Sequence, residues 1–332
     1  MRGGQGVPRR GSATPLTEHY SDAVPEPRSS STGLLAAIGA YGLWGLLPVY
    51  FIALMPTGPV EIVAWRILLS LVFCLLIIVA TRTLPALGAL LADRRILLLS
   101  GVAAVLIAIN WHVYVYASLS GFILEAALGY FINPIVTVAL GVVFLRERLR
   151  PAQWMAVGLS IVAVIVLAVG YGTVPVIALA LAFSFGFYGY VKNRMGPRVS
   201  AVGGLTLETA WLVPLAVGEL IVIAAVGSLT FGELGTVHTT LLALAGIVTA
   251  IPLLLFAAAA RRLPLTVVGF VQYLAPLLQF LFGVIVMGEE MPLERWIGFS
   301  LVWIALVVLS SDAVRARHLS RRRGAPPPVE PV

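Results

Sequence analysis

The chain has 332 residues, of which 60% are hydrophobic and 11% are charged, and its mean hydropathy is +1.00. Soluble domains carry about 25% charged residues, so this composition excludes a soluble globular protein and indicates a protein whose solvent is lipid. The formal net charge is +7, but the basic residues form short clusters between apolar runs. That distribution is typical of cytoplasmic membrane loops and argues against a nucleic-acid partner.

The two ends of the chain are polar. Residues 1–32 hold Pro, Gly, Ser and four arginines, and residues 313–332 include the basic, proline-rich run "RRRGAPPP". We expect both segments to be disordered tails on the cytoplasmic side. No signal peptide is evident, because the apolar segment after residue 32 is long enough to span and lacks a clear cleavage site.

Runs of about 20 apolar residues predict membrane-spanning helices. These runs are too long and too continuous for the strands of a membrane barrel, which alternate over about ten residues. The sequence therefore predicts an all-α polytopic membrane protein. The ten predicted spans are 33–54, 59–81, 96–117, 121–145, 151–169, 173–192, 203–226, 238–260, 264–288 and 293–311.

The basic residues of the connections test this count. Alternate connections carry arginine or lysine, and the ones between them carry almost none. The basic groups are Arg2 to Arg28, Arg82 to Arg95, Arg146 to Arg150, Lys192 to Arg198, Arg261 and Arg262, and Arg315 to Arg323. Since basic loops stay inside, we expect a multi-pass protein of the cell (inner) membrane with both termini in the cytoplasm.

Two stretches align without gaps at an offset of 142 residues, "INPIVTVALGVVFLRERLRPAQW" (132–154) and "LAPLLQFLFGVIVMGEEMPLERW" (274–296). Pro134 then falls on Pro276, and Glu147 on Glu289. The chain therefore divides into a first five-helix repeat, 33–169, and a second, 173–312. Because five spans are an odd number, the second repeat enters the membrane from the opposite side. Inverted repeats are typical of transporters whose substrate site lies between the halves.

The five-helix halves, each ending in a "P-x6-G-x5-E" pattern before a helix led by tryptophan, resemble the EamA module of the drug/metabolite transporter superfamily. The segments "WGLLPVYF", "EIVAWRILLS", "INWHVYVYA", "EAALGYFINP" and "LETAWLVPLA" resemble the RarD-like branch of that group. The resemblance covers about residues 33–312. It implies ten helices, an inner-membrane location and small-molecule export or exchange.

Arg66 is the residue that the composition explains least, because it lies about seven residues, roughly 10 Å, below the outer end of an apolar span. A charge at such depth is expensive and pairs with another group or faces a water-filled cavity. Glu125 lies in the same outer layer, so we expect Arg66 to line a central cavity with Glu125 as its counter-ion. A static pair that only clamps two helices is the alternative.

Other polar and aromatic residues complete the expected site. Cavity or substrate contacts are predicted for Asn110, His112, Trp44, Trp111, Tyr130, Asn133, Gln272 and Tyr273. Glu208, the repeat mate of Arg66, is expected in the inner half as a gate or proton-coupling site, and Glu125 and Glu219 are further coupling candidates. Plain packing is an open alternative for His112 and the aromatic residues, and an outer vestibule is an alternative for Glu219. Pro134 and Pro276 are predicted as paired kinks that act as hinges.

These features favour a secondary transporter, an exporter or exchanger that moves a small metabolite or drug by alternating access. An enzyme is disfavoured because no H-E-x-x-H pattern, clustered histidines or phosphate-binding loop is present. A single cysteine, Cys74, excludes a disulfide or a thiol-based metal site within one chain, and no cofactor or metal is expected. A channel or a non-transporting protein with a structural Arg66–Glu125 pair is the alternative. The sequence leaves the substrate open among an anion, an amino acid, an aromatic metabolite and a cationic drug. It also leaves open whether the protein forms a homo-oligomer.

Overall fold

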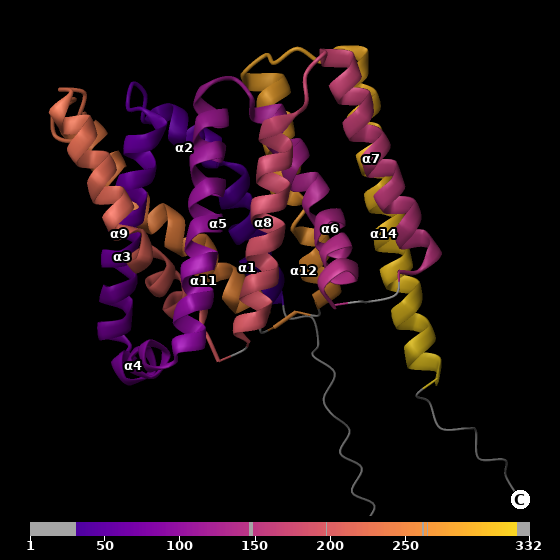
Figure 1. The fold of residues 1–332 in the computed structure, drawn as a ribbon, viewed down its shortest axis with the longest axis horizontal. Coiled ribbons are helices and arrows are strands. Elements are labelled where there is room, and N and C mark those ends of the chain that lie inside the picture. Colours follow the sequence, from indigo (N-terminus) through magenta and orange to yellow (C-terminus); the bar gives the residue numbers. More distant parts are fainter. Residues whose placement is uncertain (1–30, 146–148, 197, 261, 264, 324–332) are drawn as a thin grey trace, which may run out of the picture.

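A computed structural model describes residues 31–145, 149–196, 198–260, 262–263 and 265–323. The described part of the chain is all α-helical, as the apolar runs predict, and forms a polytopic membrane bundle (Figure 1). Its helices are α1 (Ser31–Gly45), α2 (Leu47–Ala53), α3 (Pro59–Ala80), α4 (Leu84–Ala92), α5 (Arg94–Leu119), α6 (Ile123–Leu145), α7 (Pro151–Tyr171), α8 (Val176–Met195), α9 (Ala201–Ala225), α10 (Thr236–Ala243), α11 (Ala245–Ala260), α12 (Leu265–Val271), α13 (Leu274–Leu281), the π-helical turn η1 (Phe282–Val286) and α14 (Leu293–Arg323).

Every predicted span has a helical counterpart, but several are broken. Eight helices in the described residues are long and apolar enough to cross a membrane, and a ninth results if α1 and α2, bent by 41°, count as one span. The run predicted as 264–288 is divided among α12, α13 and η1, of which Leu274–Val286 is a shorter apolar helix. The count of ten crossings therefore stays a prediction.

Prolines lie where two of these spans break. Pro48 opens α2 directly after the bend, and Pro276 follows the break between α12 and α13. Each proline lacks an N–H and crowds the preceding turn, which disfavours a continuous helix. Pro134 and Pro252 are instead accommodated inside α6 and α11, and so is Pro214 inside α9.

Two helical stretches lie outside the predicted spans. The first is α4, a short, apolar and mostly exposed helix in the connection between the second and third predicted spans. The second is the end of α14, which continues through residues 313–323 where a disordered tail was expected. The alanine, leucine and arginine of this segment are good helix formers, so the helix has no reason to stop at the membrane surface. Residues 1–30 and 324–332, the rest of the expected tails, lie outside the described residues, as does Glu147.

The helices pack in a regular order. The most extensive helix contacts are those of α3 with α9, α7 with α14, α6 with α8, α5 with α8, and α1 with α11. In addition, α11 packs on α3, and α13 packs on both α1 and α6. Figure 1 shows α4, the connection between α8 and α9, and the C-terminal end of α14 at one end of the bundle. The connections between α5 and α6, α7 and α8, and η1 and α14 lie at the opposite end.

Candidate functional site

Arg66 lies in the interior of the bundle, where only 5% of its surface is exposed. It belongs to a buried face of α3 on which Ile62, Arg66, Ser70 and Cys74 follow one another at four-residue spacing. Helices α9, α11 and α5 pack against α3. The arginine is buried between helices, and its place in the wall of a central cavity stays a prediction.

A close helix contact brings a polar partner to this arginine. Gly246 of α11 lies against the backbone of Leu69, and a side chain at that position would collide with the Leu69 carbonyl. One turn further along α11, Thr249 Oγ1 accepts a hydrogen bond of 2.8 Å from Arg66 Nε. Since the Thr249 hydroxyl proton is donated to the Ala245 carbonyl, its oxygen is free to act as the acceptor.

Aromatic rings surround the guanidinium on its other sides. Its central carbon lies 4.3 Å from the ring centroid of Trp111 and 5.7 Å from that of Phe51. Contacts of this kind stabilise a desolvated cation by about 2 kcal/mol or more. Tyr114 packs edge-on against Phe51, with ring centroids 5.9 Å apart, and Tyr130 packs against Tyr114 at 5.4 Å. We call Phe51, Trp111, Tyr114 and Tyr130, together with Arg66, the arginine cradle.

The Tyr130 hydroxyl of the cradle has a hydrogen-bond partner, whereas two other hydrogen-bond donors of the cradle have none. Tyr130 donates its hydroxyl proton to Asn110 Oδ1 at 3.0 Å. Asn110 in turn donates to the Leu181 carbonyl and to Ser184 Oγ, which ties α5 to α8. In contrast, Arg66 Nη1 and the Tyr114 hydroxyl are buried and have no hydrogen-bond partner.

The predicted Arg66–Glu125 pair is wrong. Glu125 Oε1 instead accepts hydrogen bonds from the backbone amides of Ile177 and Ala178, at 2.9 and 3.4 Å. These amides belong to the first turn of α8, whose free N–H groups and positive dipole end attract a carboxylate. The sequence places both residues in the same outer layer, but Glu125 contacts α8, whereas Arg66 contacts α11.

Two other carboxylates also hold backbone amides. Glu61 accepts from the amides of Thr230 and Phe231 at 3.0–3.1 Å. Glu289 accepts from the amides of Ile123 and Leu124, at the start of α6. Glu289 lies in the connection before α14, and its burial raises the pKa of its carboxyl group against the lowering effect of those amides. These acidic residues fasten connections and helix ends.

His112 and Glu219 form a pair of their own. His112 Nε2 lies 2.9 Å from Glu219 Oε1, and His112 Nδ1 lies 2.8 Å from the Ala108 carbonyl oxygen. The pair bridges α5 and α9 and is partly exposed on the side of these helices that also presents Ile109 and Tyr116. His112 therefore contacts Glu219 and is not part of the arginine cradle.

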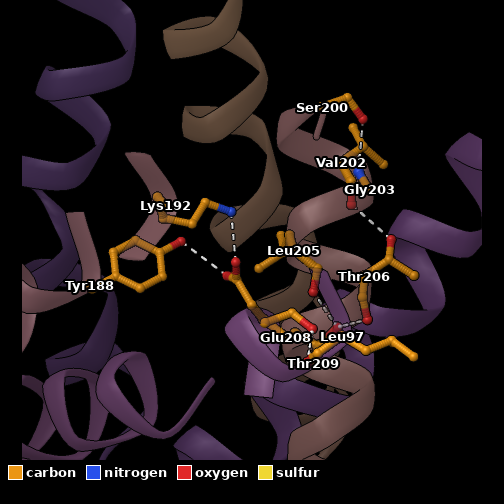
Figure 2. Close-up of polar contacts among 11 residues, drawn as sticks. Leu97, Tyr188, Lys192, Ser200, Val202, Gly203, Leu205, Thr206, Glu208 and Thr209 are labelled. Carbon is orange, nitrogen blue, oxygen red and sulfur yellow. Dashed lines mark hydrogen bonds and ion pairs between the residues drawn. The ribbon is translucent and has the colours of Figure 1, made fainter. Parts of the chain in front are cut away.

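Glu208 is the centre of a second buried cluster, on the cytoplasmic side of Arg66 if the basic connections are inside. It is fully buried, at 0% exposure, and its two oxygens accept hydrogen bonds from Lys192 Nζ at 2.6 Å and from the Tyr188 hydroxyl at 3.0 Å. Figure 2 shows Lys192 and Tyr188 pointing from the same side toward the Glu208 carboxylate. Sequence reasoning placed Lys192 in a basic loop and missed this role, although Lys192 follows Tyr188 by one helical turn.

A row of aromatic rings connects the two clusters. Neighbouring ring centroids are 5.4–6.0 Å apart from the cradle to the Glu208 cluster. The order of the row is Phe51, Tyr114, Tyr130, Phe185 and Tyr188. Four different helices contribute these rings, so the row is a tertiary feature that no local sequence pattern contains.

The remaining predicted cavity residues lie elsewhere. Trp44 packs on Tyr41 and Phe256, and its carbonyl accepts a hydrogen bond from Gln279. Asn133 lies at the contact of α6 with Gly186 of α8, and its Oδ1 is buried without a partner. Gln272 and Tyr273 follow α12, and Tyr273 lines a cavity of about 500 Å³ between α12 and α14. Within the described residues, no group of three or more His, Cys, Asp or Glu side chains is placed to hold a metal ion.

Comparison with known proteins identifies the class of this bundle. Residues 31–169 match the model of the EamA-like transporter family. The protein RarD of Streptomyces exfoliatus is 49% identical over 292 residues, which cover 88% of this chain and 92% of that protein. The chain belongs to the EamA-like transporter family, in its RarD-like branch.

Other relatives of this EamA-type transporter agree. The protein RarD of Escherichia coli is 39% identical over 87% of this chain and 97% of its own length. The chloramphenicol-sensitive protein RarD of Pseudomonas aeruginosa is 31% identical over 90% of this chain and 99% of its own length. A crystal structure with 20% sequence identity, which covers 90% of this chain and 100% of the other, has a TM-score of 0.54 and shares the fold. The chain is a multi-pass membrane transporter, and these names point to transport and not to catalysis.

Proposed function

We propose that this EamA-type protein is a secondary transporter that moves a small metabolite or drug across the inner membrane by alternating access, as an exporter or exchanger. The arginine cradle is the proposed substrate site. The proposed transporter needs no cofactor, and membrane lipid surrounds it.

The observation that carries this proposal is the state of Arg66. An arginine in hydrocarbon costs a few kcal/mol at least, and a leucine would pack in this span without that cost. The chain nevertheless keeps a buried guanidinium with an unused Nη1 donor. A group of this kind is expected where a ligand completes the interactions, because buried donors in a finished core are satisfied by the protein itself.

The Glu208 cluster supports alternating access. Helix α8 packs mainly on α5 and α6, and α9 mainly on α3 and α5, so α8 and α9 share little backbone contact. Lys192 and Tyr188 on α8 reach across to Glu208 on α9. We propose that this cluster is the inner gate, since breaking its contacts would separate α8 from α9 where little else holds these helices together.

The order of helix contacts supports an inverted repeat. Under the predicted division, the contact of α1 with α11 corresponds to that of α8 with α5, and the contact of α11 with α3 corresponds to that of α5 with α9. Three further contacts join helices that are each other's repeat mates, namely α3 with α9, α7 with α14 and α6 with α13. Such a pattern is expected when a twofold axis relates halves 33–169 and 173–312. Pro134 and Pro276 are then equivalent hinge candidates.

Counterflow in proteoliposomes tests the function directly. Vesicles that hold the purified protein are loaded with one compound at high concentration and exposed to a trace of the labelled compound outside. A carrier accumulates label transiently above equilibrium, whereas a channel only lets it equilibrate. We expect counterflow for at least one member of a metabolite and drug panel. We expect Arg66→Gln to abolish it, while Arg95→Gln, the same change at an exposed position, leaves it intact.

A further inference from the structure

The charge of Arg66 is not balanced by any acidic side chain of the described residues. The carboxylates of the surrounding helices are all engaged elsewhere. Glu125 and Glu61 hold backbone amides, Glu208 holds Lys192 and Tyr188, and Glu219 holds His112. The acceptor that the protein does supply to Arg66 is the neutral hydroxyl of Thr249. The site therefore carries a positive charge that a ligand can neutralise.

The two unused hydrogen-bonding groups of the cradle can both act as donors, although a tyrosine hydroxyl can also accept. Arg66 Nη1 can only donate, and the Tyr114 hydroxyl can donate a proton as well. Both are buried and without a partner. A ligand that offers oxygen acceptors would satisfy both groups, and a guanidinium binds carboxylate or phosphate oxygens with strong, directional hydrogen bonds. A ligand ammonium group would meet the arginine charge with no carboxylate to compensate it.

The walls of the cradle indicate the rest of the ligand. The rings of Phe51 and Trp111 lie against the guanidinium, and Tyr114 and Tyr130 continue the aromatic wall from Phe51. These rings offer a large apolar contact area to a flat hydrophobic group. The row continues from Tyr130 through Phe185 to Tyr188, so the same surface extends from the cradle toward the inner cluster.

We propose that the transported ligand is a small organic anion, with a carboxylate or equivalent oxyanion bound by Arg66 Nη1 and the Tyr114 hydroxyl and an apolar or aromatic body packed against the cradle rings. The inference rests on the proposed transport function and narrows its substrate class. It disfavours cations, because Arg66 would repel them and the cradle holds no carboxylate to compensate, and zwitterions, whose ammonium group would lie close to Arg66.

Binding to the purified, full-length protein tests this class without any transport measurement. The probes are benzoate, 3-phenylpropionate and indole-3-acetate, each compared with its own neutral amide, and 3-phenylpropylamine as the cation. Ionic strength is matched with sodium chloride. Binding is followed by quenching of tryptophan fluorescence, to which Trp111 contributes at the site, and by the rise in thermal unfolding temperature that a ligand of the native state produces.

We expect at least one carboxylate to bind, and to bind about tenfold or more tightly than its amide, because a hydrogen bond to a charged group is at stake. 3-Phenylpropylamine should not compete. Tyr114→Phe removes one unused donor and keeps the ring, so it should weaken carboxylate binding by about tenfold or more, the effect of one hydrogen bond to a charged group. Arg66→Gln should remove the preference for the carboxylate over its amide, and the matched control Arg95→Gln should keep it.

The opposite results would overturn the proposal. These are equal affinity for acids and amides, preference for the amine, no binding by any of the carboxylates, or an unchanged preference in Arg66→Gln. If Arg66→Gln does not fold, the comparison of acid with amide on the native protein and the Tyr114→Phe variant still decide. Counterflow of a cation or neutral compound alongside absent carboxylate binding would reject the substrate class and leave the transporter function standing.

Discussion

Glu125 illustrates how a buried carboxylate can serve the fold without serving the substrate. Its Oε1 holds two consecutive amides at the start of α8. Glu125→Ala removes this cap, so we expect a loss of about 1–2 kcal/mol in stability and a lower midpoint of thermal unfolding in detergent. Ligand affinity should change little. Glu290→Ala, a change at an exposed acidic position, is the control, and loss of ligand binding at unchanged stability would return Glu125 to the substrate site.

Arg66 and Glu125 are predicted to act independently, because each contacts other groups. In a double-mutant cycle with Arg66→Leu and Glu125→Ala, the coupling energy should lie within about 0.5 kcal/mol of zero. The same cycle with Lys192→Ala and Glu208→Ala should give about 1–3 kcal/mol, since those side chains are in direct contact. Unfolding free energies in mixed micelles provide both values. A large coupling in the first cycle would mean that Arg66 and Glu125 do meet.

The sequence predicted which single residues are buried better than it predicted their partners. The length of the apolar runs and the expense of charge in lipid correctly indicated that Arg66 and Glu208 are buried in the protein. Depth along the helix axis can be counted from the sequence, but the direction in which a side chain points depends on how neighbouring helices rotate and pack. Glu125 was therefore paired wrongly, and Thr249 was missed. The one-turn spacing of Tyr188 and Lys192 puts them on one helix face, but it does not indicate that Glu208 lies opposite.

At the scale of elements, the proposed inner gate makes a prediction that requires no substrate. Cys74 is the single cysteine of the chain, is 1% exposed on α3, and lies on the buried face of that helix, which packs on α9, the helix that carries Glu208. It is thus a natural reporter of separation at the Glu208 cluster. In inside-out vesicles, a charged maleimide should react slowly with the native protein and about tenfold or more faster with Lys192→Ala or Glu208→Gln, because loss of the buried ion pair favours separation of α8 and α9.

Two comparisons make that labelling decisive. Arg194→Ala removes a basic residue two positions beyond Lys192 that is exposed, and it should leave the labelling rate of Cys74 unchanged. Right-side-out vesicles should show no acceleration for any variant. Faster labelling from the outer face, or equal rates in all variants, would mean that the cluster does not close the inner side.

Hydropathy alone does not predict where a helix breaks or which connections are helical. The apolar runs located every long apolar helix within a few residues, since burial in lipid requires both length and low charge. They did not indicate that the run 264–288 breaks into α12, α13 and η1, nor that α4 and the end of α14 are helical. A helix outside the membrane is stabilised by propensity and local contacts, which an apolar-run criterion cannot detect.

At the scale of the whole molecule, the predicted topology places the basic connections inside and the two halves in opposite orientations. The test uses single cysteines in a Cys74→Ala background at exposed positions in or beside four connections. Ser120→Cys and Ser228→Cys should react with an impermeant maleimide in intact cells, and Arg95→Cys and Asn193→Cys should react only after the membrane is opened. The reason is that basic loops stay on the cytoplasmic side.

Ser120 follows the third predicted span of the first half, and Ser228 follows the second span of the second half. An odd number of spans in each half puts both positions outside, whereas parallel halves would leave Ser228 inside. Labelling of Ser228→Cys only in opened cells would therefore reject the inverted repeat, and labelling of Arg95→Cys in intact cells would reject the orientation itself.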